Sequence, residues 1–122
     1  MPSERQLLEV LDKIAVDASG FIAASLVDLE SGMTLAVKSV RPDFDLTAAS
    51  AYNSELVKQK MKIMHTLQLT GSIEDMLITL TEQIHLIKLL NKTTFLYLAV
   101  DRSQSNLAIV RGAVQRHANA LV

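Results

Sequence analysis

The sequence has 122 residues, with 12 Lys or Arg, 13 Asp or Glu and no Cys. This length fits one domain, so we expect residues 1–122 to fold as a single unit. The balanced charge argues against nucleic-acid binding, which usually shows a basic excess. The absence of Cys excludes a disulfide framework and a thiolate metal site. No apolar run approaches the roughly 20 residues of a membrane span, and the N-terminus lacks a signal-peptide pattern, so we expect a cytoplasmic protein.

The first third of the chain predicts a helix followed by a β-hairpin. Ser3 and Gln6 form a capping-box pattern, so a helix is expected to begin near residue 3 and to end before Gly20. The apolar segments 21–28 and 33–39 predict two strands. The short break at residues 30–32 joins them as a hairpin.

The longest predicted helix runs from Leu46 to Leu67, with Asp45 or Thr47 as its N-cap. At 100° per residue it shows two apolar stripes, wider together than a surface helix needs. One stripe is Tyr52, Leu56, Ile63 and Leu67; the other is Leu46, Val57, Met61 and Met64, with Asn53 and Lys60 between them and Ser54, Glu55, Lys58, Lys62 and His65 opposite. Either the helix lies deep in its own fold, or one stripe covers this chain's sheet and the other meets a second chain.

Three further apolar runs predict a meander of strands, at residues 73–80, 84–90 and 95–101. Loops this short allow only antiparallel neighbours. A last helix is expected from about Ser105 to Leu121, with an inward line of Leu107, Val110, Val114, Ala118 and Leu121. The order α-β-β-α-β-β-β-α predicts an α+β fold, with the long helix on one face of a five-stranded antiparallel sheet and the terminal helices on the other.

The order of the strands also follows from their composition. Strands 21–28 and 95–101 are apolar on both faces, so we expect them to be central. Strand 73–80 begins with charged residues, which suits an edge. If this edge and the long helix both meet a two-fold mate, the two sheets merge. The residues expected in this dimer interface are Leu46, Asn53, Val57, Lys60, Met61, Met64, Ile73, Asp75 and Leu77.

The sequence shows no constellation of catalytic residues. Phosphate-loop, dinucleotide, zinc-protease and nucleophile-elbow motifs are absent, and the three histidines lie on different elements. We therefore expect no enzyme activity, no metal and no cofactor. Asp101 and Arg102 end the last strand at a loop, where we expect a local ion pair or a turn rather than an acid–base pair. Lys58 and Lys62 suit a solvated face, with docking of a partner as the alternative.

The chain resembles the roadblock/dynein light chain family. The likeness is carried by GFIAASLVDLESGMTLAV at 20–37, IEDMLITLTEQIHLIKLL at 73–90 and TFLYLAVDRSQSNLAIVR at 94–111. The turn DLESG and the final NLAIVR are similar to the bacterial branch of the family. The resemblance implies a homodimer built through the second helix and the third strand.

The resemblance also implies a regulatory or scaffold role. Bacterial members are partners of small Ras-like GTPases, to which they supply a docking surface rather than a catalytic residue. The alternative from the residues is a small-ligand sensor of the PAS or GAF type, which has a similar sheet but needs a concave pocket with converging polar groups.

Overall fold

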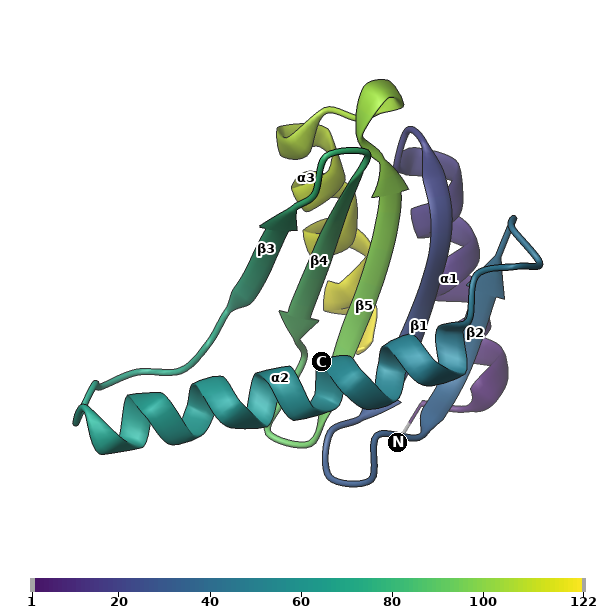
Figure 1. Ribbon diagram of the computed structural model, residues 1–122. Helices are drawn as coiled ribbons and strands as arrows, with labels where there is room; N and C mark the ends of the chain where they lie inside the picture. Colours follow the sequence, from purple (N-terminus) through teal and green to yellow (C-terminus); the bar gives the residue numbers. More distant parts are fainter. Residues whose placement is uncertain (1, 122) are drawn as a thin grey trace.

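The computed structural model describes residues 2–121 as one open antiparallel sheet with helices on both faces (Figure 1). The strand order is β2-β1-β5-β4-β3. The elements are α1 (Glu4–Asp17), β1 (Phe21–Asp28), β2 (Thr34–Ser39), α2 (Leu46–Thr66), β3 (Asp75–Thr79), β4 (Gln83–Leu89), β5 (Thr94–Asp101) and α3 (Leu107–Ala118), with short 3₁₀ turns η1 (Arg102–Gln104) and η2 (Asn119–Leu121). The predicted fold class, the central position of β1 and β5 and the edge position of β3 are confirmed.

The two faces of the sheet carry separate apolar clusters, because β1 and β5 are buried on both sides. Helices α1 and α3 cover one face and α2 crosses the other (Figure 1). The α1/α3 cluster is centred on aliphatic side chains such as Leu11, Ile14 and Leu98. The α2 cluster contains Val57, Phe95 and Tyr97.

Side-chain caps fix where the helices begin. Ser3 and Gln6 form the predicted capping box, and Asp45 accepts a hydrogen bond from the backbone N–H of Ala48 at 3.0 Å. Asn106 caps α3, so this helix begins two residues later than the predicted Ser105. Each cap satisfies an N–H group that has no partner within the helix.

Two residues lie on a different side of their helix from the predicted one. Leu107 was expected to point inward but is 41% exposed, while Ala113 is buried on α3. Ser54 was expected on the outer side of α2 but is fully buried, and its hydroxyl donates to the carbonyl oxygen of Leu29 at 2.5 Å. The β1–β2 turn packs against this flank of α2, where a Cβ on Gly32 would lie 3.3 Å from Ala51 Cα.

None of the helices in the described range 2–121 combines the length and apolarity needed to cross a bilayer.

Candidate functional site

Helix α2 is longer than the sheet is wide, and its C-terminal half projects beyond the edge strand β3 (Figure 1). The segment 67–74 returns from the tip of the helix to β3. Between them lie two adjoining hollows of about 280 Å³ and about 540 Å³. Met64, Leu69 and Ile73 line both.

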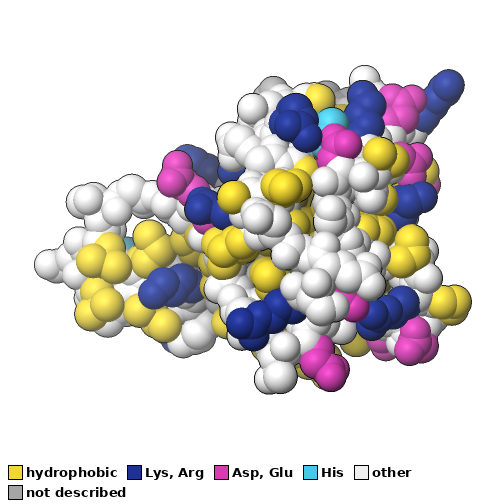
Figure 2. Space-filling model, turned by 90° about the horizontal axis from the view of Figure 1, so that it is seen from above, with side chains coloured by type: hydrophobic (Ala, Val, Ile, Leu, Met, Phe, Trp, Pro, Cys, Tyr) yellow, Lys and Arg dark blue, Asp and Glu magenta, His cyan; other side chains and the backbone are white. Residues whose placement is uncertain are grey.

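The projecting part exposes a large share of apolar side chains. Figure 2 shows hydrophobic side chains gathered on its upper surface. Leu69 is 53% exposed, and Met61, Met64 and Ile73 are half-buried around the hollows. A monomeric domain rarely leaves a contiguous apolar area of this kind uncovered.

A second apolar row follows the outer side of α2. Its members are 38–76% exposed and are Tyr52, Leu56, Ile63 and Leu67. Ile63, Lys62 and Leu67 also border a shallow hollow of about 200 Å³. The two-stripe prediction is therefore confirmed in part, since one stripe covers the sheet and the other lies open.

Two of the predicted interface residues belong to the chain's own core. Val57 has no exposed surface and Leu46 is 8% exposed, and both pack against the sheet. The prediction that they meet a second chain is wrong, because the sheet-facing stripe had been assigned to the mate. Met61 also packs partly against this core.

Of the other predicted residues of α2, Lys60 and Met64 line the hollows, whereas Asn53 lies nearer the start of the helix. Met64 and the exposed Lys60 line the larger one. Asn53 is half-buried on the same helix, and its Nδ2 donates to the carbonyl oxygen of Ala49 at 2.7 Å. That interaction is within the helix, so the structure does not test a contact of Asn53 with a mate.

Strand β3 supplies the backbone edge beside the hollows. The backbone N–H of Leu80 bonds to the carbonyl oxygen of Gln83, and that of Leu89 to Glu74. Since hydrogen-bonded and non-hydrogen-bonded pairs alternate in an antiparallel ladder, the N–H and C=O groups of Asp75, Leu77 and Thr79 face away from β4. These three positions, of which Asp75 and Leu77 belong to the predicted interface, can therefore form backbone hydrogen bonds with another strand.

The side chains of Asp75 and Leu77 serve the chain itself. Asp75 Oδ2 lies 2.9 Å from Arg111 Nη2 and 3.0 Å from Nε, which ties the edge strand to α3. Leu77 packs against the α1/α3 cluster. These two residues can therefore contribute to an interface through their backbone groups, and the two side chains hold the edge in place.

The two edges of the sheet differ in how well they suit pairing. On β2 the register shifts by one residue between Leu26 and Val27, Lys38 lies in mid-strand, and Pro42 follows. A bulge, a Lys and a Pro all discourage strand addition. Strand β3 pairs with β4 in regular register and contains neither Lys nor Pro. The β3 edge, which lies beside the projecting apolar half of α2, is thus the edge that suits pairing with another strand.

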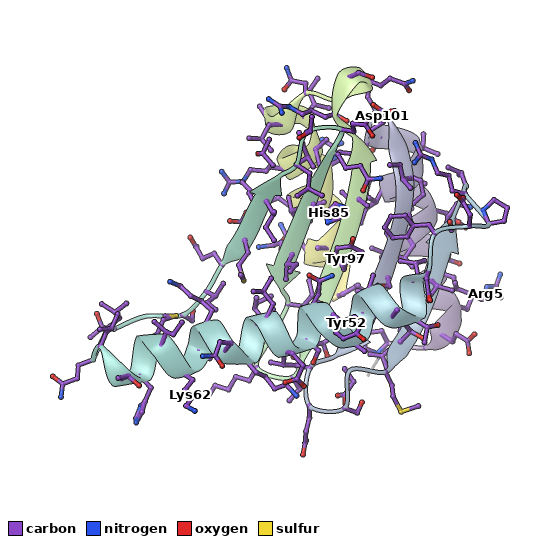
Figure 3. All side chains as sticks on the ribbon, in the orientation of Figure 1. Arg5, Tyr52, Lys62, His85, Tyr97 and Asp101 are labelled. Atoms are coloured by element: carbon purple, nitrogen blue, oxygen red, sulfur yellow. The ribbon has the colours of Figure 1, made fainter. Side chains whose placement is uncertain are left out.

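The two lysines predicted as possible docking residues have different surroundings. Lys58 Nζ lies 2.9 Å from Glu55 Oε1 and donates to the carbonyl oxygen of Glu30 at 3.2 Å. Lys62 is exposed, on the α2 side away from the sheet (Figure 3). A docking role therefore stays a prediction for both.

Helix α2 covers only part of its face of the sheet, and a polar cluster occupies the uncovered part. His85 Nε2 lies 2.7 Å from Gln83 Oε1, and His85 Nδ1 lies 3.2 Å from the Tyr97 hydroxyl. In Figure 3 His85 and Tyr97 lie on the strands above α2. Burial lowers the pKa of His85 and raises that of Tyr97 to about 12. Sequence reasoning missed this cluster, whose only signal was the i, i+2 spacing of Gln83 and His85 in one strand.

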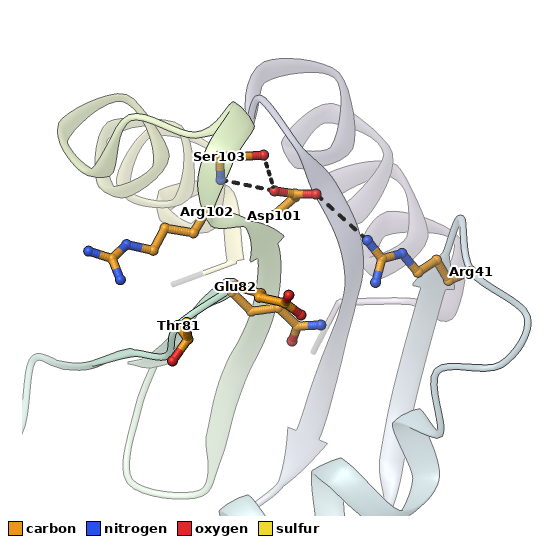
Figure 4. Close-up of a pocket in the computed structure, with 7 residues that line it drawn as sticks. Arg41, Thr81, Glu82, Asp101, Arg102 and Ser103 are labelled. Carbon is orange, nitrogen blue, oxygen red and sulfur yellow. Dashed lines mark hydrogen bonds and ion pairs between the residues drawn. The ribbon is translucent and has the colours of Figure 1, made fainter.

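An open polar cleft of about 590 Å³ lies at the end of the sheet (Figure 4). Asp101 accepts hydrogen bonds from Ser103, which lower the pKa of its carboxyl, and lies 3.8 Å from Arg41 Nη2. Arg102 points away and donates to the carbonyl oxygen of Leu80 at 3.2 Å. Of the two predicted alternatives for Asp101 and Arg102, a local ion pair or a turn, the structure has the turn, since Asp101 caps η1 and Arg41 is the cation beside its carboxylate.

No group of three or more His, Cys, Asp or Glu able to hold a metal occurs among residues 2–121. Within the cleft, Asp101 is paired with Ser103 and Arg41, and Arg102 bonds to the backbone carbonyl of Leu80.

No protein-family model matches this sequence, and no curated protein matches it either. Solved structures do match. MglB of Myxococcus xanthus superposes over 99% of this chain and 88% of its own, with a TM-score of 0.89 and 14% identity. The gliding protein MglB of Thermus thermophilus covers 99% and 90%, with a TM-score of 0.85 and 17% identity. A Roadblock/LC7 domain of Streptomyces avermitilis covers 93% and 92%, with a TM-score of 0.81 and 13% identity.

These superpositions cover 93–99% of this chain and 88–92% of the matched chains. At this identity they establish the fold and leave activity open. The chain therefore has the roadblock/LC7 fold, in the form seen in the MglB proteins.

Proposed function

We propose that the protein is a non-catalytic, homodimeric regulator or scaffold that binds a small Ras-like GTPase. The observation that carries the proposal is that the apolar C-terminal half of α2 projects beyond the sheet beside β3, an edge strand without a bulge, Lys or Pro. A solitary chain leaves Leu69 53% exposed, with Met64 and Ile73 half-buried around the hollows. A second copy is an occupant that matches both the apolar area and the free backbone edge.

A two-fold axis beside β3 satisfies both features together. Antiparallel pairing of β3 with its mate uses the outward backbone groups of Asp75, Leu77 and Thr79. The same rotation carries each projecting helix over the other chain's sheet, where α2 leaves part of its own face uncovered (Figure 1). Met64 and Ile73 then pack between the two copies, and Lys60 lies at the border of the interface.

The GTPase partner rests on the likeness to MglB and on the outer side of α2. This side carries exposed apolar residues with Lys62 beside them, and a two-fold pair presents it twice. A mixed apolar and basic surface suits a protein partner with acidic groups around an apolar contact. The protein would act by holding the GTPase in a chosen conformation, since no catalytic group is present on this surface.

A direct test mixes the purified protein with Ras-like GTPases encoded by the same genome, in GDP and GTP-analogue forms. We expect binding that prefers one nucleotide state and a changed rate of hydrolysis or exchange. Lys62→Glu and Leu67→Asp should weaken binding while the chain stays folded and dimeric. Lys92→Glu, an exposed charge reversal in the β4–β5 turn, is the matched control. The absence of binding in both nucleotide states would argue strongly against this partner.

The small-ligand sensor raised by the sequence is not favoured. Such a sensor needs a largely enclosed pocket with unpaired polar groups pointing inward. Here the cleft of about 590 Å³ at the end of the sheet is open to solvent, and Asp101 within it is already paired with Ser103 and Arg41.

A further inference from the structure

The uncovered part of the α2-side face has a histidine at its centre. His85 lies in mid-strand on β4, in register with Ile78 of β3 and Ala99 of β5. It is half-buried, and its ring meets the edges of Tyr97 and Phe44 at centroid distances of 5.4 Å and 6.5 Å. The imidazole therefore lies on the part of the sheet face that the projecting helix of a second copy would cover.

Both ring nitrogens of His85 have partners that suit the neutral imidazole. The amide oxygen of Gln83 can only accept, so Nε2 carries the hydrogen and donates to it at 2.7 Å. Nδ1 then accepts from the Tyr97 hydroxyl at 3.2 Å. This arrangement satisfies all three side chains at once.

A second proton on the ring breaks this arrangement. A hydrogen on Nδ1 points at the Tyr97 oxygen, so the hydroxyl hydrogen of Tyr97 must turn elsewhere. Tyr97 is 1% exposed within an apolar cluster, where a hydroxyl hydrogen without an acceptor is costly. Burial also raises the free energy of the charged imidazolium relative to that of the neutral ring.

The immediate neighbours of His85 offer no compensating charge. Ile78 from β3, Ala99 and Tyr97 from β5, and Phe44 from the loop before α2 are all uncharged at neutral pH.

The charged groups on the same face of the sheet lie at the end of the sheet or on the projecting half of α2. At the end of the sheet, Asp101 is paired with Arg41, and Glu82 lies in the adjoining turn. On α2, Lys60 lines the larger hollow and His65 lines the smaller one. His65 is thus the other histidine beside the proposed interface.

We propose that His85 makes self-association of this protein dependent on pH: neutral His85 lets the mate's helix pack onto the sheet, and protonated His85 weakens that packing. The inference rests on the proposed two-fold dimer. Covering the ring removes the solvent that stabilises its charge, so the separated chain binds the proton more readily than the dimer. Each dimer contains two such rings. Its Kd can therefore rise by up to about a hundredfold per pH unit where only the separated chains are protonated.

The test is sedimentation velocity across a concentration series at about pH 7.5 and about pH 5.5. We expect the wild-type Kd to be at least roughly tenfold higher at the lower pH, with unchanged circular dichroism. His85→Gln should dimerise with a Kd that no longer changes with pH. His65→Gln is the matched control and should keep the wild-type pH dependence.

A second measurement separates this inference from general acid sensitivity. The imidazole resonances of His85 are titrated by NMR at a dilute and a concentrated protein sample. The inference requires a lower pKa of His85 in the concentrated sample, and equal pKa values overturn it. Loss of the pH dependence in His65→Gln also overturns it. A dimer with a pH-independent Kd contradicts only the role of His85, whereas a monomer at both pH values contradicts the proposed dimer as well.

Discussion

The hydroxyl of Ser25 in the middle of β1 lies 2.8 Å from the hydroxyl of Ser50 in α2, and both residues are fully buried. This contact joins the central strand directly to the first turns of the long helix. Together with the bond from Ser54 to Leu29, it sets how α2 lies on the sheet and therefore where its C-terminal half projects.

Removing both hydroxyls should cost less than the summed costs of removing each one alone. Ser50→Ala leaves the Ser25 hydroxyl buried without a partner, so we expect a loss of about 1–3 kcal/mol in the free energy of unfolding. The double variant Ser25→Ala/Ser50→Ala should lose clearly less than the sum of the single variants. Urea unfolding of the four proteins measures the difference. Additive losses would show that the two hydroxyls do not interact.

Proline on the free edge of β3 should separate the dimer without unfolding the chain. The N–H of Thr79 faces away from β4 and its side chain is exposed, so Thr79→Pro removes no bond within the sheet. We expect a monomer by sedimentation, with a thermal transition close to that of the wild-type. The control is Val37→Pro on β2, whose N–H also faces outward, because the Val40 N–H bonds to Ile22 and the pairs alternate. A monomer from this variant would place the interface at the other edge.

A carboxylate in the hollow beside α2 should also disrupt the dimer. Met64→Glu places a charge where the mate packs, and an unpaired buried charge costs several kcal/mol. We expect Kd to rise at least roughly a hundredfold, since each 1.4 kcal/mol changes Kd about tenfold. Thr47→Glu, at the exposed start of the same helix, should leave Kd unchanged. Met61→Glu is less informative because Met61 also packs against the chain's own core.

The buried phenol of Tyr97 should make the protein sensitive to alkali. Burial raises its pKa from 10.0 to about 12, so the unfolded chain loses this proton first as pH rises. Stability is therefore intact below about pH 10 and falls between about pH 10 and about pH 12, by on the order of 2–3 kcal/mol. Denaturant unfolding across this range measures the loss.

The two tyrosines of the chain provide the control for that measurement. Tyr97→Phe should remove the alkaline loss, at the cost of the hydrogen bond to His85. Tyr52 is 76% exposed, so Tyr52→Phe should keep the alkaline loss unchanged. Equal behaviour of the two variants would contradict the assignment to Tyr97.

The sequence by itself determined the order of elements and most of the sheet. Apolar residues at both parities in strands 21–28 and 95–101 required cover on both faces, which made these strands central. The capping box at Ser3 and Gln6 fixed the start of α1, and Asp45 was one of two predicted caps of α2, because capping signals are local and depend on few neighbours. Helical spacing likewise predicted that α2 carries more apolar surface than one sheet contact uses.

Only the tertiary structure decided which side of α2 faces the sheet. A helical wheel gives the angle between two stripes but not the rotation of the helix, so Val57 and Leu46 were assigned to a mate although they lie in the core. The burial of Ser54 depends on the β1–β2 turn, which reaches α2 from residues far away in the chain. The cluster of Gln83, His85 and Tyr97 depends on the register between β4 and β5, which no local pattern specifies.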